Sequence, residues 1–395
     1  MKIVIVPSGF KECLDAEEVA LAMERGVRRF DQTIDMEVIP MIDGGEGFAK
    51  TIVNLKDGEL IYQQVTGPVG EKVLGHFGLF VENDKRTAVI EMAAVSGLKL
   101  VPRDQRNPLK TTTYGVGELI LSALDLGVDN ILIGCGDSGT SDGGAGMAQA
   151  LGVQFFDKKH RYVHINGGED LLKVDSLDLT KLDKRLQTVA IDVACNWQNI
   201  LCGEEGVARV FGPQKGATPV QVEQLSSALE HYATLIQETV GTDVRSLPGS
   251  GASGGLGAGL IAFTGATLHP RFDIIMDYIN IEEKILTADI VFTAEGSLDF
   301  QTPNGKIPSE VARIAKKNNI PVIAITGTIG KGADLNYHAG IDAYSSIIQK
   351  PTSLEMAIKK APKWIEESTE SVLRQVTIGL DIAKRKFLKE RVYQR

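Results

Sequence analysis

Short apolar runs alternate with helically spaced stretches at both ends of the chain. Residues 2–6 form a β-branched run that predicts a buried strand, and residues 16–30 follow with helical periodicity behind Asp15, which can cap that helix. Residues 36–39 predict the next strand. The last third returns to this alternation, with strands predicted over residues 289–293 and 321–326 and helices over residues 309–318 and 354–372. Strands that alternate with helices indicate a parallel sheet.

The middle of the chain has a different pattern. Consecutive strands are predicted over residues 58–65, 73–81 and 87–91. A helix is expected over residues 114–126, and a long amphipathic helix over residues 220–240. Strands in direct succession followed by helices are typical of a mixed sheet.

We therefore expect an α/β protein of two domains. Residues 1–80 and 281–380, from the two ends of the chain, would build an open parallel-sheet domain of the Rossmann or flavodoxin-like kind. Residues 81–280 would form a second, mixed α/β domain inserted into it. Ligands of open α/β sheets bind beyond the carboxyl ends of the strands, so the loops that follow predicted strands are the places to search for a site.

Composition narrows the classes of partner. The chain has 395 residues, 43% hydrophobic content and a formal net charge of −9, so we expect no affinity for nucleic acid or acidic lipid. No apolar run is long enough to span a membrane, and no signal peptide is expected. The four cysteines form no C-x-x-C pair, which favours a cytoplasmic protein without disulfides.

The loop after the apolar run at residues 130–133 is made almost wholly of glycine, serine, threonine and aspartate. Its glycines and the helix that follows suit an anion, while Asp137 and Asp142 make sense beside a phosphate if Mg²⁺ lies between them. The spacing of Gly134, Gly136 and Gly139 also matches the dinucleotide fingerprint. A nicotinamide-dependent hydroxy-acid dehydrogenase and a simple helix-capping turn therefore remain alternatives.

Other polar segments are candidates for phosphate or carboxylate chemistry. Residues 294–302 place two carboxylates, an amide and hydroxyls in one loop with Lys306 just beyond, a set that suits Mg²⁺ or a substrate hydroxyl. Arg106 and the threonines at 111–113 suit a substrate carboxylate. Each segment has a simpler explanation as a solvated loop or linker. A Walker A motif is absent, so a phosphotransferase here would not be of the P-loop kind.

Taken together, these segments resemble the bacterial glycerate kinases that phosphorylate D-glycerate. The resemblance runs nearly end to end and is carried by Phe10-Lys11, residues 43–47, Glu91-Met92-Ala93, Ser96-Gly97-Leu98, Arg106-Asn107-Pro108, Gly117-Glu118-Leu119-Ile120, residues 141–147, residues 211–218, Gly254-Gly255-Leu256-Gly257, Glu295-Gly296 and Gly305-Lys306. It implies two α/β domains with a cleft between them and an activity that uses ATP and Mg²⁺.

The chain departs from the family pattern at several positions. Ser8 stands where the family has an aspartate, Asn196 where it has another aspartate, and Ser297 where it often has arginine, while Asp137 adds a carboxylate. Loss of one general base typically costs about 10²–10⁴-fold in rate, so these changes would slow or redirect phosphoryl transfer without ending it.

From the residue types together with the resemblance, we expect the following roles. The catalytic candidates are Lys11, Asp43, Asn196 and Asp299. The candidates for contact with the nucleotide and its phosphates are Gly136, Ser138, Thr140, Asp142, Lys215 and Lys306. The candidates for contact with the substrate are Glu46, Arg106, Thr112, Thr113 and Gln301, and those for the metal are Asp137 and Glu295.

The function expected from this resemblance is ATP-dependent phosphorylation of D-glycerate, with 2-phosphoglycerate favoured as the product. A kinase of a related small hydroxy acid and a non-catalytic ligand-binding paralogue are the alternatives, because of Ser8, Asn196 and Ser297. The expected partners are small molecules, with a homo-oligomer as a possibility.

Overall fold

The computed structural model describes residues 1–11, 13–42 and 44–393, with side chains to residue 386. The chain divides into two compact units, of which Met1–Ile42 and Asn280–Arg395 form unit 1 and Asp43–Ile279 forms unit 2. The α/β class with an open parallel sheet and an inserted mixed sheet is confirmed. The first boundary lies near residue 42 and not near residue 80, because the two strands before residue 83 pair with the sheet of unit 2.

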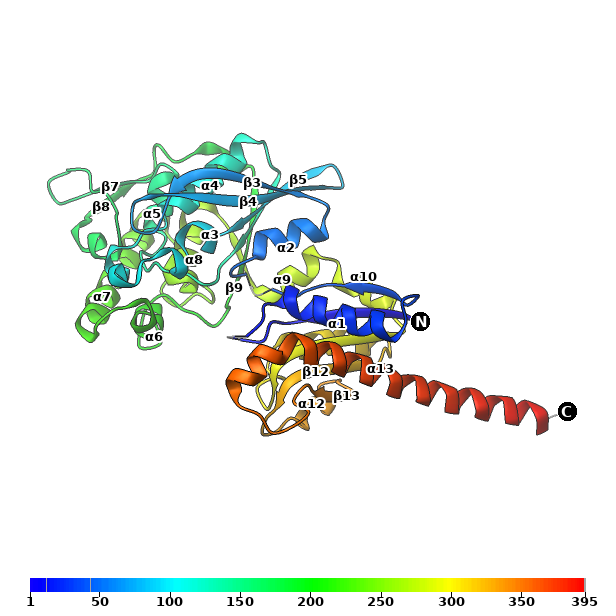
Figure 1. Ribbon diagram of the computed structural model, residues 1–395. Coiled ribbons are helices and arrows are strands. Elements are labelled where there is room, and N and C mark those ends of the chain that lie inside the picture. The colour runs from blue at the N-terminus through cyan, green and yellow to red at the C-terminus, as the bar shows by residue number, and fades with distance from the viewer. Residues whose placement is uncertain (12, 43, 394–395) are drawn as a thin grey trace. The chain divides into compact units, whose positions relative to one another are not determined.

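Unit 1 contains a five-stranded, fully parallel sheet in the order β13-β12-β11-β1-β2. Two of its strands, β12 and β13, are labelled in Figure 1. Its strands are β1 (Lys2–Pro7), β2 (Asp35–Val38), β11 (Ile290–Leu298), β12 (Val322–Ile329) and β13 (Ala343–Ser346). Its helices are α1 (Ala16–Phe30), α10 (Ile281–Leu286), α11 (Ile307–Lys317), α12 (Leu335–His338) and α13 (Leu354–Tyr393). The helix predicted over residues 354–372 therefore continues for some twenty residues more.

Local sequence explains how unit 1 begins. The β-branched residues of β1 are fully buried and pair with β11 in the register Ile3↔Ile290. Asp15 and Glu18 form the predicted capping box at the start of α1. Helices α1 and α13 pack closely, and a Cβ at Gly26 would approach the carbonyl oxygen of Glu366 to 2.5 Å. Glycine is therefore required where the two helices cross.

Unit 2 contains a six-stranded mixed sheet in the order β10-β9-β6-β5-β4-β3 and a small β7-β8 hairpin. Its strands are β3 (Glu59–Thr66), β4 (Lys72–Glu82), β5 (Lys85–Glu91), β6 (Asn130–Gly134), β7 (Gln154–Phe156), β8 (Ser176–Asp178), β9 (Ala190–Cys195) and β10 (Thr267–Pro270). Its helices are α2 (Phe48–Leu55), α3 (Ala93–Ser96), α4 (Tyr114–Asp125), α5 (Ala145–Ala150), α6 (Val207–Phe211), α7 (Pro219–Val240), α8 (Ala252–Thr264) and α9 (Arg271–Tyr278). Strands β5, β6, β9 and β10 run parallel, so their carboxyl ends and the loops that follow share one edge.

The glycine-rich first turn of α8 packs against the loop after β6. Ser253, Gly254 and Gly255 all have positive φ angles, which interrupt regular helix geometry at this point. A Cβ at Gly254 would lie 1.9 Å from the carbonyl oxygen of Thr140, so only glycine allows the two backbones to touch. No helix among the described residues is long and apolar enough to cross a membrane.

Candidate functional site

In unit 2, the loop of residues 135–144 after β6 is organised around one buried carboxyl group. Asp142 is fully buried and accepts hydrogen bonds from Thr113 N at 2.8 Å and Thr113 Oγ1 at 2.9 Å. The N–H groups of Gly144 and Gly146, at the start of α5, also donate to it. Asp142 therefore caps α5 and joins it to Thr113. This geometry gives both residues a structural role, and their predicted contacts with nucleotide and substrate stay predictions.

A buried lysine lies beside this loop. Lys215 is 3% exposed, and its Nζ donates to Ser138 Oγ at 2.8 Å and to the carbonyl oxygen of Thr140 at 2.6 Å. Burial lowers the pKa of Lys215 to about 7, with the nearby carboxyl of Asp142 acting in the opposite sense. The amine is therefore close to its titration point near neutral pH. A strongly shifted pKa in a group held by so few partners is a mark of functional sites.

Three more polar atoms near this lysine are buried without a partner. Among the described residues, none donates to or accepts from Thr140 Oγ1, Ser141 Oγ or Arg106 Nε. Gly216, next to Lys215, packs so tightly on Arg106 that a Cβ there would lie 2.3 Å from the Arg106 carbonyl oxygen. Buried polar groups are nearly always hydrogen-bonded in native proteins. Two hydroxyls, a guanidinium and an ammonium without full partners are what an anionic ligand would satisfy.

A second polar group of unit 2 surrounds the turn before α2. The carboxylate of Glu46 pairs with Lys99 Nζ, and the Glu46 N–H donates to Asp137 Oδ2 at 3.0 Å. Asp137 has a φ angle of 49°, which the hydrogen bond to the turn supports. A Cβ at Gly136 would approach Gly45 to 2.6 Å, so close packing of two loops is enough to require glycine there. The predicted roles of Glu46, Asp137 and Gly136 toward ligands stay predictions.

Two other predicted residues of unit 2 differ in exposure. Asn196, directly after β9, is exposed and its Oδ1 accepts from Gln198 N at 3.2 Å, an arrangement typical of a turn. Thr112 is buried and its Oγ1 accepts from Tyr114 N at 3.2 Å, at the start of α4. Asn196 remains accessible to a ligand, whereas the hydroxyl of Thr112 is used within the chain.

Sequence reasoning missed a polar network between β9, β10 and α9. His269 Nε2 lies 2.7 Å from Asp192 Oδ1, and Tyr278 OH donates to Asp192 Oδ2 at 3.1 Å. Asp192 is far in the sequence from His269 and Tyr278, and no short motif marks them. Only the parallel pairing of β9 with β10 brings the histidine to the aspartate.

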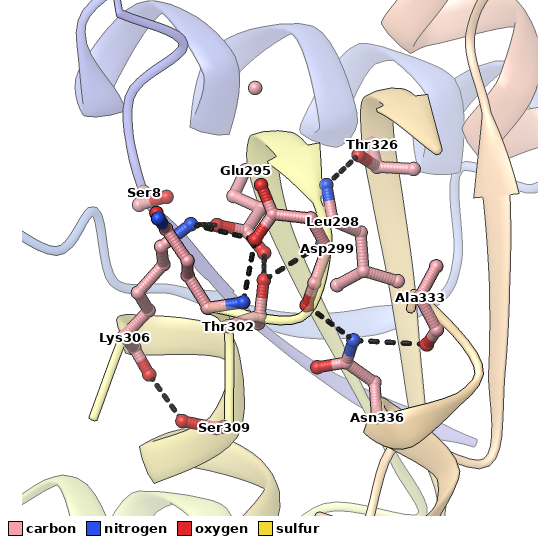
Figure 2. Close-up of polar contacts among 12 residues, drawn as sticks. Ser8, Glu295, Leu298, Asp299, Thr302, Lys306, Ser309, Thr326, Ala333 and Asn336 are labelled. Carbon is pink, nitrogen blue, oxygen red and sulfur yellow. Dashed lines mark hydrogen bonds and ion pairs between the residues drawn. The ribbon is translucent and has the colours of Figure 1, made fainter. Parts of the chain in front are cut away.

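In unit 1, the end of β11 and the loop that follows it place two predicted carboxylates beside one ammonium (Figure 2). Lys306 Nζ lies 3.6 Å from Glu295 Oε2 and 3.4 Å from Asp299 Oδ1. Thr302 donates its hydroxyl to Glu295, and its Oγ1 accepts from Asp299 N at 3.2 Å. Glu295, Asp299, Thr302 and Lys306 thus form one cluster at the carboxyl end of a parallel strand, where ligands of such sheets bind.

Burial shifts the acid–base behaviour of this cluster. Glu295 is 6% exposed, and burial raises its pKa, while Thr302 and Lys306 act in the opposite sense and Asp299 adds to the rise. A carboxylate with a raised pKa accepts a proton more readily than a solvated one. Asn336 holds the backbone of the loop by donating from Nδ2 to the Asp299 carbonyl oxygen at 3.1 Å.

The remaining candidates of unit 1 are exposed or form hydrogen bonds within the chain. Gln301 is exposed and its N–H donates to Asp299 Oδ1 at 2.8 Å, while Lys11 is exposed after β1. Ser8 donates its hydroxyl to the Ala294 carbonyl oxygen at 2.8 Å, so it joins β1 to β11. Asp43, predicted to be catalytic, lies outside the described residues.

A divalent metal would be held here by few protein ligands. No group of three or more histidine, cysteine, aspartate or glutamate side chains placed to hold a metal occurs in residues 1–11, 13–42 and 44–393. Mg²⁺ in phosphotransferases is usually held by one or two carboxylates together with phosphate oxygens. Glu295 and Asp299, which both lie beside the Lys306 ammonium, are two carboxylates of this kind.

Comparison with known proteins identifies one family. The glycerate kinase family matches residues 3–377. The chain is 45% identical to the glycerate kinase of Haemophilus influenzae, over 95% of this chain and 98% of that protein. It is 42% identical to the glycerate 2-kinase of Escherichia coli, over 96% and 99% of the two chains. A crystal structure from Salmonella typhimurium LT2, assigned as a glycerate kinase 2, superposes with a TM-score of 0.83 at 45% identity, covering 96% of this chain and 99% of that one.

These similarities extend over both units and include the loops after β6 and β11 described above. They leave the dehydrogenase alternative without support, and the fingerprint glycines serve loop packing. The chain is therefore an enzyme that belongs to the glycerate kinase family.

Proposed function

We propose that the enzyme transfers the γ-phosphoryl group of ATP to a hydroxyl of D-glycerate, and that 2-phosphoglycerate is the product. The observation that carries this proposal is the match to glycerate kinases along nearly the whole chain. The Glu295 cluster supports it, because phosphoryl transfer to an alcohol needs both a proton acceptor and a cation.

The chemistry assigned to unit 1 is proton acceptance and charge neutralisation. The glycerate oxygen attacks the γ-phosphorus, a new P–O bond forms, the bond to the ADP oxygen breaks, and the hydroxyl proton passes to a carboxylate. We assign that acceptance to Asp299, which is less buried than Glu295. Lys306 neutralises the transferring phosphate. Mg²⁺, when bound by Glu295 and Asp299, would supply further neutralisation of phosphate charge.

The chemistry assigned to unit 2 is anion binding. Lys215, Arg106 and the hydroxyl of Thr140 would bind an anionic group of substrate or nucleotide. This assignment is supported by the polar atoms that lack partners within the described residues. Asn196 is exposed, and we expect this departure from the family to affect which hydroxy acid the enzyme prefers.

The test is ³¹P NMR of the products formed from ATP, Mg²⁺ and D-glycerate. The expected result is ADP and a monoester resonance coupled to the proton on C2, which identifies the 2-phosphate. A 3-phosphate would contradict the product assignment alone. Turnover only with another small 2-hydroxy acid would favour the substrate alternative, and no turnover with any such acid would favour the non-catalytic one.

Matched variants test the assigned lysine. Lys306→Met should lower kcat by about 10²–10³-fold, the range typical for loss of a group that stabilises transition-state charge. Lys331→Met, at an exposed lysine of the same unit, should leave kcat unchanged. Equal activity of the two variants would refute the role of Lys306.

A further inference from the structure

One buried carboxyl group of unit 2 has no part in the chemistry assigned above. Glu91 is the last residue of β5, at the sheet edge where the carboxyl ends of the parallel strands lie, and is 3% exposed. Carboxylates this deeply buried are rare unless paired. A basic side chain near it is His76 on β4, with Nε2 4.0 Å from Glu91 Oε2. Its burial therefore needs an explanation.

Glu91 contacts the beginning of α2. Its Oε2 accepts from Ala49 N at 3.2 Å, and the Gly47 backbone also donates to the carboxyl group. Helix α2 has Gly47 as its N-cap, no side-chain cap and no acidic residue in its first turn. The first N–H groups of a helix have no partners within the helix and carry partial positive charge. Glu91 therefore supplies from a distant strand the cap that the local sequence omits.

The turn that this cap holds contains Glu46. The N–H of Glu46 donates to Asp137 Oδ2, and its carboxylate pairs with Lys99. Since Gly47 follows Glu46 directly and is bound to Glu91, the orientation of Glu46 depends on the buried carboxylate. The Glu91 cap thereby connects β5 with the loop after β6.

We propose that Glu91 is a positioning residue for the kinase reaction, which through the first turn of α2 fixes residues 44–47 and with them the Glu46–Lys99 pair. This inference rests on the proposed kinase function and on the contact with substrate that the sequence predicts for Glu46. It assigns Glu91 no contact with substrate. It also makes the geometry of the turn depend on the charge of one buried group.

The surroundings of Glu91 make this charge sensitive to pH. Burial raises the pKa of Glu91 to about 7; the hydrogen bonds from Ala49 and Gly47 oppose the rise, and the carboxylates of Glu46 and Asp137 add to it. Burial lowers the pKa of His76, so this neighbour is neutral near pH 7 and offers no compensating charge. Lys99 is paired with Glu46. Above about pH 7 the cap is an anion, and below it the cap is neutral and weaker.

The experiment compares Glu91→Gln with the unmodified enzyme in kcat and KM for D-glycerate from pH 5.5 to 9. At pH 8 we expect kcat/KM of the variant to be at least tenfold lower, because a neutral amide replaces the anionic cap. Below pH 6 the two enzymes should converge, because Glu91 is then protonated and the cap is neutral in both. Parallel profiles, or equal values at pH 8, would overturn the proposal.

A matched control lies at the other end of the same helix. Glu82 pairs at 2.7 Å with Lys56, the C-cap of α2, and Glu82→Gln should leave the pH profile unchanged. Hydrogen exchange of residues 44–55 supplies an independent readout, with faster exchange expected in Glu91→Gln at pH 8 only. Faster exchange with unchanged kinetics would refute the proposed dependence on Glu46 while leaving the glycerate kinase assignment intact. If Glu91→Gln does not fold, Glu91→Asp serves the same comparison, with partial retention of the alkaline activity expected.

Discussion

Replacement of Lys215 by methionine should make unit 2 more stable near neutral pH and the enzyme less active. The lysine is fully enclosed, and burial lowers its pKa from 10.5 to about 7. Each pKa unit corresponds to about 1.4 kcal/mol, so the ammonium form is disfavoured in the folded state on the order of 5 kcal/mol. Methionine has similar length and carries no charge, so it avoids this cost.

The sign follows from proton linkage. Between about pH 7 and pH 10.5 the unfolded chain binds the Lys215 proton and the folded chain does not, so stability of the unmodified protein rises with pH across this window. The methionine variant lacks that contribution. Its advantage should therefore shrink by about 3 kcal/mol from pH 7 to pH 9.5. Loss of the hydrogen bonds to Ser138 and Thr140 costs about 1–3 kcal/mol at every pH and cannot imitate this slope.

The assay is urea unfolding followed by tryptophan fluorescence. The two tryptophans lie in different units, so a Trp364→Phe background leaves Trp197 as the reporter of unit 2. Lys110→Met, at an exposed lysine of the same unit, controls for loss of charge alone. A stability difference that stays constant between pH 7 and pH 9.5 would refute the reasoning. Lower kcat/KM of Lys215→Met beside higher stability would indicate that the buried lysine is retained for function.

Three further outcomes follow from the contacts described above. Thr113→Val should lower the free energy of unfolding by about 2–4 kcal/mol, measured by urea denaturation, because it leaves the buried Asp142 with fewer donors; a loss below 0.5 kcal/mol would contradict that role. Gly254→Ala should destabilise by more than about 2 kcal/mol, since its φ is +75° and the added carbon would meet the Thr140 carbonyl oxygen, whereas Gly241→Ala, at a positive φ with open space around it, should cost less. Thr302→Val should remove a hydrogen bond that lowers the pKa of Glu295, and so move the acidic limb of the kcat profile to higher pH. An unchanged limb would contradict a role for Glu295 in the reaction.

Local sequence was sufficient for much of the fold and for the positions of the loops. The β-branched run of β1 and the capping box of α1 each depend on neighbours within a few residues, so their patterns predicted them correctly. The first boundary between the units, near residue 42, could not be predicted in this way. Strands β3 and β4 pair with β5, and this choice of partner is made by side-chain packing and not by strand propensity.

The candidate site also has features that follow from local sequence and features that do not. The sequence placed Glu295, Asp299 and Lys306 in one loop because they are close along the chain. Only the tertiary structure decided that Lys215 is enclosed and that Glu91 caps a helix it does not belong to. Burial and long-range hydrogen bonds set the charge of these two groups, and both depend on segments that lie some forty or more residues away in the sequence. The sequence therefore supplied the chemical groups of Lys215 and Glu91, while the folded chain decided their protonation and their hydrogen-bond partners.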